Sequence, residues 1–140
     1  METYRLMAIN LNTKQQRDIL VYVDDNNKSD MLSMYTDIDE HTTESENENF
    51  FVMFQEFRDK LLSYGYGLKC CGAMINAIQS PMAEGSEWIY LVTLGEQARK
   101  KDMVSIFDDA DIIEFPDTKQ QNEFFRQWSD SLRGCYYGTV

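Results

Sequence analysis

Three apolar stretches in the second half of the chain constrain its fold most strongly. They cover residues 66–73, 87–94 and 103–108, and each has the length and the aromatic or β-branched content of a strand. In 87–94 both alternating sets of residues are largely apolar, which is typical of a strand that is covered on both faces. We therefore predict three successive strands, the middle one central in its sheet.

The first half of the chain predicts a hairpin followed by a helix. Residues 4–11 and 17–24 have the composition of strands, and the short polar link between them favours an antiparallel pair. Residues 48–64 form the clearest helical pattern, because aromatic and aliphatic side chains recur there at steps of three and four. These side chains are Phe50, Phe54, Phe57, Leu61 and Tyr64. Gly65 suits the left-handed residue that ends many helices.

A second long helix is predicted near the end of the chain. Asp117 or Thr118 is its expected cap, Thr118 and Gln121 match the spacing of a capping box, and Gly134 is its expected end. Together these elements predict one α+β domain over residues 1–140. It would have an antiparallel or mixed sheet of about five strands with two long helices packed on it, in the order ββαβββα.

The chain is strongly acidic. It has 13 Lys and Arg against 24 Asp and Glu, a net charge of -11. Such a surface repels phosphate backbones and anionic lipids, so we expect no direct binding to nucleic acid or to a membrane. A basic protein or a metal cation is a more suitable partner, although acidity can also serve solubility alone.

The carboxylates gather in two stretches that contain no Lys or Arg, 37–48 and 108–117. We predict that 37–49 is a solvated, mobile loop. Clustered charge repels itself, so a basic partner that neutralises it would lower this cost. The predicted partner-binding residues are Asp37, Asp39, Glu40, Glu44, Glu46, Glu48, Asp108, Asp109 and Asp111. Tyr35 and Tyr136 are candidate aromatic anchors for the same partner.

The sequence contains no recognisable catalytic or metal-binding motif. His41 is the only histidine, which excludes a site with two histidine ligands, and no glycine-rich phosphate loop follows a strand. We therefore predict no catalytic residues, no metal and no cofactor. Paired carboxylates in a cleft stay open as an alternative, because an acidic protein offers many such pairs.

The cysteines favour a reducing compartment, and the apolar runs are too short to predict a membrane span. Cys70, Cys71 and Cys135 are an odd set with one adjacent pair, which is no disulfide framework. We expect Cys70 and Cys71 to be reduced and at least one of them to be buried. No apolar run approaches the roughly 20 residues of a membrane span, and the first residues do not look like a signal peptide. The expected location is the cytoplasm.

A family resemblance covers roughly residues 61–132. A glycine-flanked stretch with Cys71-Gly72-Ala73 is followed by a loop with Ser80-Pro81-Met82, a strand with Tyr90, and the segment Val104-Ser105-Ile106-Phe107-Asp108. The last helix adds Trp128-Ser129-Asp130-Ser131-Leu132. In these residues the chain resembles small bacterial immunity proteins that neutralise contact-dependent growth inhibition toxins or related polymorphic toxins. It departs from them at 74–77, where a polar and often basic run is expected.

The resemblance implies a cytoplasmic inhibitor with no catalysis of its own. Its partner would be the C-terminal domain of a cognate toxin, whose active site or an adjacent surface it would block. Many such toxins are basic nucleases, which agrees with the charge of this chain. The alternatives are a small cytosolic enzyme that uses carboxylates in a cleft and an acidic adaptor between proteins.

Overall fold

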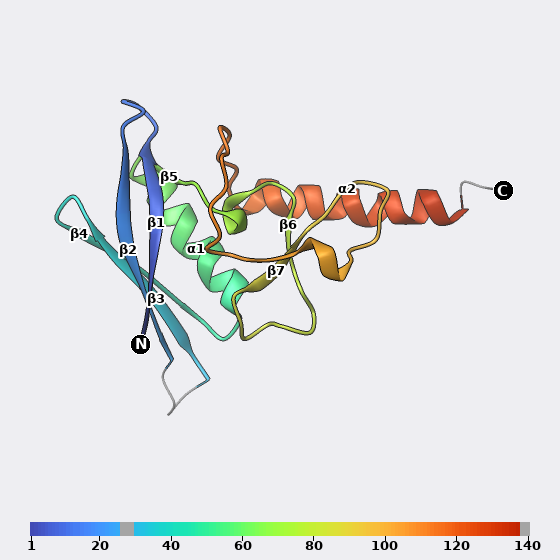
Figure 1. The fold of residues 1–140 in the computed structure, drawn as a ribbon, viewed down its shortest axis with the longest axis horizontal. Helices are drawn as coiled ribbons and strands as arrows, with labels where there is room; N and C mark the ends of the chain where they lie inside the picture. Colours follow the sequence, from blue (N-terminus) through green and yellow to red (C-terminus); the bar gives the residue numbers. More distant parts are fainter. Residues whose placement is uncertain (26–29, 138–140) are drawn as a thin grey trace.

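The computed structural model describes residues 1–25 and 30–137, with side chains described as far as Arg133. Its main layer is a five-stranded sheet curled around one helix (Figure 1). The strands are β1 (Glu2–Asn10), β2 (Gln16–Asp25), β3 (Leu32–Ile38), β4 (His41–Asn47) and β5 (Tyr66–Leu68). Their order across the sheet is β4-β3-β2-β1-β5, and every neighbouring pair is antiparallel. The predicted α+β class is confirmed.

The predicted N-terminal hairpin is confirmed as β1 and β2. Their register pairs Glu2 with Val23 and Ile9 with Gln16. The Asn10 side chain begins the connecting turn, because its Oδ1 accepts hydrogen bonds from the backbone N–H groups of Asn12 and Thr13 at 2.9 and 3.1 Å.

The predicted acidic loop over 37–49 is wrong, because most of this stretch belongs to a second hairpin. β3 and β4 pair along their whole length and are joined by Asp39 and Glu40, whose φ angles are 49° and 65°. Two central residues with positive φ are the hallmark of the tight turn that suits a twisted hairpin. β4 lacks an apolar pattern because its inward residues are Thr43 and Ser45, and the Ser45 hydroxyl donates to the carbonyl of Met53 at 2.7 Å.

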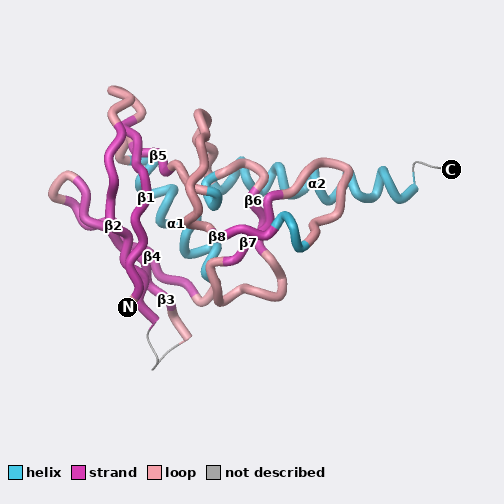
Figure 2. The backbone as a smooth tube through the Cα atoms, in the orientation of Figure 1, coloured by secondary structure: helices cyan, strands magenta, loops and turns pink. Residues whose placement is uncertain are grey.

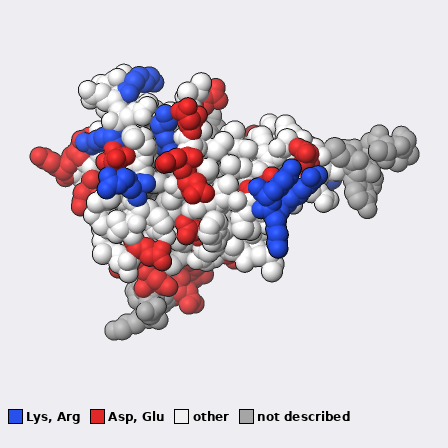
Figure 3. Space-filling view, viewed as in Figure 1, with Lys and Arg blue, Asp and Glu red and all other residues white. Residues whose placement is uncertain are grey.

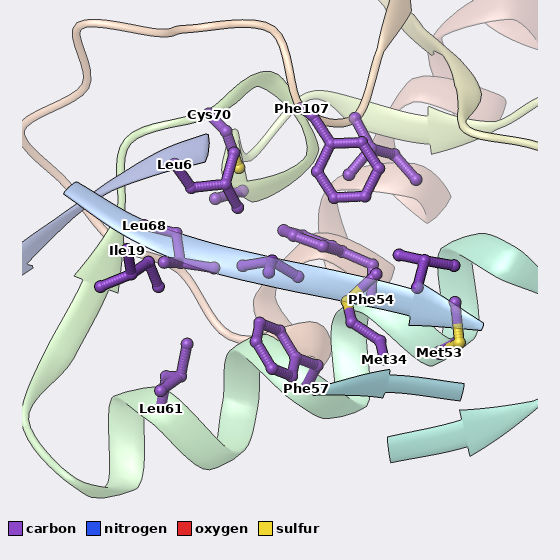
Figure 4. Packing of buried hydrophobic residues seen from close by; sticks show 14 of the residues in the cluster. Leu6, Ile19, Met34, Met53, Phe54, Phe57, Leu61, Leu68, Cys70 and Phe107 are labelled. Carbon is purple, nitrogen blue, oxygen red and sulfur yellow. The ribbon is translucent and has the colours of Figure 1, made fainter. Parts of the chain in front are cut away.

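The first helix follows its prediction closely. α1 (Phe50–Ser63) begins after Asn49, whose side chain accepts a hydrogen bond from the N–H of Val52 at 3.1 Å, and Gly65 follows its end with a φ of 90°. Figure 4 shows its aromatic stripe against the inner face of the sheet. The labelled contacts there include Phe54, Phe57 and Leu61 from the helix and Leu6, Ile19 and Met34 from the strands; all are buried.

The second half forms shorter strands than predicted. β5 ends at Leu68, and the chain then turns through a short 3₁₀ helix, η1 (Cys71–Ala73), in place of the predicted strand end. Within η1 the backbone is pressed against the core at Gly72, where a Cβ atom would be 2.7 Å from the Ile106 side chain. The five-stranded sheet takes only β5 from this half.

The remaining strands make a separate small sheet, β6-β7-β8. They are β6 (Ala77–Gln79), which the sequence pattern missed, β7 (Trp88–Leu91) and β8 (Met103–Ser105). β7 is central, as predicted, but it is not covered on both faces, because Ile89 is fully buried whereas Trp88 is 45% exposed. A 3₁₀ helix, η2 (Lys100–Asp102), precedes β8. Figure 2 shows these strands beside α2, apart from the large sheet.

The last helix, α2 (Thr118–Tyr137), extends away from the body of the protein (Figure 1). Its capping box uses Asp117 and Gln120, not Thr118 and Gln121: the N–H of Gln120 donates to Asp117 and the N–H of Asp117 donates to Gln120, at 2.9 and 3.0 Å. The helix also passes its predicted end at Gly134. Because four strands precede α1, the predicted order ββαβββα is wrong. Among the described residues no helix is long and apolar enough to cross a membrane.

Candidate functional site

The structure places the nine predicted partner-binding carboxylates at two edges of the five-stranded sheet. Asp37, Asp39, Glu40, Glu44, Glu46 and Glu48 lie on or just after the β3–β4 hairpin, and Asp108, Asp109 and Asp111 follow β8. All nine are exposed. The second group lies beside β5, because Asp109 forms an isolated bridge with Cys70 and the N–H of Ala110 donates to the carbonyl of Lys69 at 3.2 Å. β4 and β5 are the two edge strands of the sheet.

Between these edges lies an open sheet surface, which we call the outer face. It consists of the side chains of β1–β4 that point away from α1, alternating with the buried inward ones. On β2 the inward Ile19, Val21 and Val23 are buried, while Leu20 is 42% exposed. The members of the outer face are Thr3, Arg5, Met7, Asp18, Leu20, Tyr22, Asp24, Ser33, Tyr35, Asp37, Thr42, Glu44 and Glu46.

Two tyrosines form the middle of the outer face. Tyr22 of β2 pairs with Tyr35 of β3, and Tyr35 pairs in turn with Glu44 of β4. The two rings are stacked, with centroids 5.1 Å apart. Leu20 is the next outward residue along β2. An aromatic pair and a leucine therefore share an open surface, with carboxylates beside them.

Negative charge dominates the outer face. It carries five carboxylates, Asp18, Asp24, Asp37, Glu44 and Glu46, and one cation, Arg5, which lies 3.4 Å from Asp18. Within the described part of the chain the other four carboxylates form no ion pair. Asp37 accepts a hydrogen bond from the Thr42 hydroxyl at 2.5 Å, which orients it without neutralising it.

The segment 109–111 borders this face from the opposite edge. Asp109 and Asp111 line a shallow hollow of about 320 Å³ together with Arg5, Met7 and Asp18 of the outer face. Lys69 lies in the same hollow and pairs with Asp111 at 3.1 Å. Figure 3 shows acidic side chains on the sheet side of the molecule, with some Lys and Arg side chains among them, and a separate basic group near η2. Part of each predicted acidic group therefore meets one surface: Asp37, Glu44 and Glu46 lie on the outer face, and Asp109 and Asp111 border it.

Two of the predicted residues have internal roles. Asp108 accepts a hydrogen bond from the N–H of Ser105 at 3.0 Å and so stabilises the turn after β8. Asp39 accepts hydrogen bonds from the Tyr66 hydroxyl and from Arg17, the latter at 2.8 Å. The bond from Tyr66, followed by that from Arg17, lowers the pKa of Asp39, and Asp39 raises the pKa of Tyr66. Asp39 is thus already paired and fastens the hairpin tip to β5.

The cysteines are packed as apolar side chains. Cys70 and Cys71 are both buried and free, which confirms the prediction for them, and Cys135 lies outside the described side chains. Burial raises the pKa of the Cys70 thiol to about 12 and also raises that of Cys71. Among the described residues no three His, Cys, Asp or Glu side chains gather as metal ligands would.

A buried polar cluster connects the two helices. Gln121 of α2 accepts hydrogen bonds from Gln55 at 3.0 Å and from Arg58 at 2.6 Å, and it donates to the carbonyls of Gly72 and Met74 at 2.9 and 2.7 Å. Arg58 also pairs with Asp59 at 2.8 Å. Burial lowers the pKa of Arg58. These groups hold α2 to the body of the protein.

Beside this cluster α1, β6 and α2 enclose a groove of about 750 Å³. Its walls are mainly apolar, with Phe51, Ile78, Phe125 and Trp128 among them, and Glu84 is the one ionisable carboxylate in its lining. Such a groove can hold an apolar group, but it brings together no pair of carboxylates for acid–base chemistry.

Comparison with known proteins gives no family assignment. No protein-family model matches the chain, and a search of curated proteins finds no match either. The resemblance to immunity proteins therefore stays a prediction.

The sequence pattern missed most of the outer face. Asp18, Leu20, Tyr22 and Asp24 lie in the predicted strand 17–24, and their alternation with Ile19, Val21 and Val23 assigns them to the side opposite the core. Tyr35, a predicted anchor, lies in the middle of this face, and the side chain of Tyr136 lies outside the described residues.

Proposed function

We propose that this protein binds and neutralises a cognate bacterial toxin domain with a basic surface, as immunity proteins do. The observation that carries the proposal is the outer face, an open sheet surface with five carboxylates and one arginine. Uncompensated charge of one sign favours a partner of the other sign and speeds encounter with it. The resemblance over residues 61–132 points to the same role.

The chemistry of a nuclease-type toxin suits this mode of inhibition. Such an enzyme holds its phosphate substrate with Lys and Arg side chains. A surface rich in carboxylates offers those cations substitute anions, so the inhibitor can cover the active site or a surface beside it. This role needs no catalytic residue, metal or cofactor in the inhibitor.

The two alternatives make different demands on the chain. An enzyme that uses carboxylates would need two of them facing one bound substrate, whereas the carboxylates of the outer face are spread over a sheet. An acidic adaptor would use the same surface for a partner that is no toxin. The neighbouring reading frame separates the proposed function from the enzyme, since an immunity protein is expected beside its toxin and an enzyme in a metabolic operon.

Co-expression tests the proposal directly. The C-terminal domain of the toxin encoded next to this chain is expressed in a bacterium with and without the chain, and growth is followed. We expect growth to stop with the domain alone and to recover when this protein is present, and the two to purify together. Persistent growth arrest despite a soluble, folded inhibitor would contradict the proposal.

A further inference from the structure

We infer that the toxin docks on the outer face itself, with Leu20, Tyr22 and Tyr35 as the anchors that lose their water on binding. This inference rests on the proposed function and names its surface. Charge alone directs attention to the acidic stretch 37–48, whereas the sheet geometry adds apolar side chains between the charges. The partner it implies is a protein surface with an apolar centre surrounded by Lys and Arg.

The first argument is the position of the three anchors. Tyr22 and Tyr35 are cross-strand neighbours with stacked rings, and Leu20 is two residues before Tyr22 on the same side of β2. Residues two apart on a strand point to one face and lie roughly 7 Å apart. The three side chains therefore form one continuous patch, which a single partner surface can cover.

The second argument is that the patch is open. α1 packs on the inner side of the sheet, and in Figure 1 the second sheet and α2 lie on that side too. Leu20 keeps 42% of its surface exposed, while its inward neighbours Ile19 and Val21 are buried. Tyrosine is enriched at the centres of protein interfaces, where it offers a large apolar surface with a polar tip.

The third argument is the charge around the patch, which selects the occupant. Asp18, Asp24, Asp37, Glu44 and Glu46 border it along β2, β3 and β4, and Arg5 of β1, which pairs with Leu20, is the one cation of the face. Nucleic acid and anionic membranes are repelled by this rim. A second copy that offered the same face would set carboxylates against carboxylates, so the fitting occupant is a basic protein.

The chain supplies a matched pair of variants for the test. The double substitution Leu20→Ala and Tyr35→Ala removes two anchors and leaves every charge in place. The control, Met82→Ala with Leu94→Ala, truncates two apolar side chains that are 95% and 50% exposed in loops outside the outer face. The probe is the purified C-terminal domain of the toxin encoded next to this chain. Its affinity is measured by calorimetry at one fixed salt concentration.

We expect the anchor variant to bind at least tenfold more weakly than the wild type and the control variant to stay within about twofold, since truncation of a few central residues carries most of the loss at an interface. Melting curves of the free variants establish that both are folded. Wild-type affinity in the folded anchor variant, or an equal loss in the control, overturns this docking face while the proposed function stands. Absence of binding by the wild type overturns the proposed function and the docking face with it.

Discussion

Replacing Gln121 with leucine should destabilise the fold strongly, because this side chain is the centre of the buried cluster between α1 and α2. Leucine is close to glutamine in size but forms no hydrogen bond. The substitution removes partners from the Gln55 amide, from the carbonyls of Gly72 and Met74, and from the Arg58 guanidinium. Arg58 keeps its bonds to Asp59 and Thr118, at 2.8 and 3.2 Å.

The magnitude follows from the groups that are left without this partner. A buried polar group without a hydrogen bond costs about 1–3 kcal/mol, and a buried leucine recovers about 1.5–3 kcal/mol in transfer free energy. With three neutral groups affected and partial relaxation, we expect the free energy of unfolding to fall by about 3–5 kcal/mol. That is a large share of the roughly 5–15 kcal/mol that stabilises a typical domain.

Urea unfolding followed by circular dichroism measures this loss, with the free energy extrapolated linearly to water. Gln127→Leu is the matched control, since Gln127 lies on the exposed surface of the same helix, and it should change the free energy by less than about 0.5 kcal/mol. A loss below about 1 kcal/mol for Gln121→Leu would show that the buried cluster does not hold α2 to the body, and would refute the reasoning.

Three further predictions concern charge, pH and thiols. The first variant replaces five acidic residues of the β3–β4 region by their amides (Asp37, Glu40, Glu44, Glu46 and Glu48). It should associate with the toxin domain about tenfold or more slowly at low salt, with a flatter salt dependence and a nearly unchanged melting temperature. A stopped-flow association rate and salt slope equal to those of the wild type would mean that these carboxylates are ordinary solvated surface. Asp39→Asn should lower the melting temperature near neutral pH, and the difference in melting temperature from the wild type should disappear in acid. The folded state lowers the pKa of Asp39, so the stability that its carboxylate contributes is present above the ordinary carboxyl pKa and is lost as the pH falls through the lowered pKa. A difference in melting temperature that is constant with pH would contradict the role of its bonds to Tyr66 and Arg17. A thiol reagent should label fewer than three cysteines in the native protein and all three after denaturation, because Cys70 and Cys71 are buried and their pKa values are raised; rapid native labelling of all three would contradict this packing.

The elements that sequence predicts well have a strong and local signal. α1 joins a regular aromatic stripe to a capping asparagine before it and a glycine after it. β2 alternates regularly between buried and exposed residues, and its short polar link to β1 leaves little choice of pairing. In α1 and in the β1–β2 hairpin the local sequence pattern agrees with the packing, so the sequence predicts both elements correctly.

The sequence pattern does not predict β4, and the reason is physical. It is an edge strand whose inward positions hold Thr43 and Ser45, so the side chains that it buries carry hydroxyl groups and are not aliphatic. Asp39 suits the first position of its turn, but the second position holds Glu40 where glycine is usual, so the turn has no clear sequence signal. The charge in 37–48 therefore resembles a loop while the chain forms a hairpin.

The candidate site, like the fold, is predictable from the sequence only in part. Composition identifies the acidic stretches, but only the pairing of β2 with β3 and of β3 with β4 brings Tyr22, Tyr35 and Glu44 into one row. The connection of 109–111 to the same face depends on the contact of this segment with Lys69, far away in sequence. Neither relation can be read from a stretch of sequence by itself.

Titration of the toxin's activity with purified inhibitor tests the central claim most directly. The toxin domain encoded next to this chain is held at a fixed concentration well above the expected dissociation constant, and its activity is measured as the wild-type protein is added. Our account predicts that activity falls linearly to zero near one inhibitor per toxin domain, and that inhibition weakens as salt screens the charges. Full activity at a severalfold excess of folded inhibitor in low salt would contradict it.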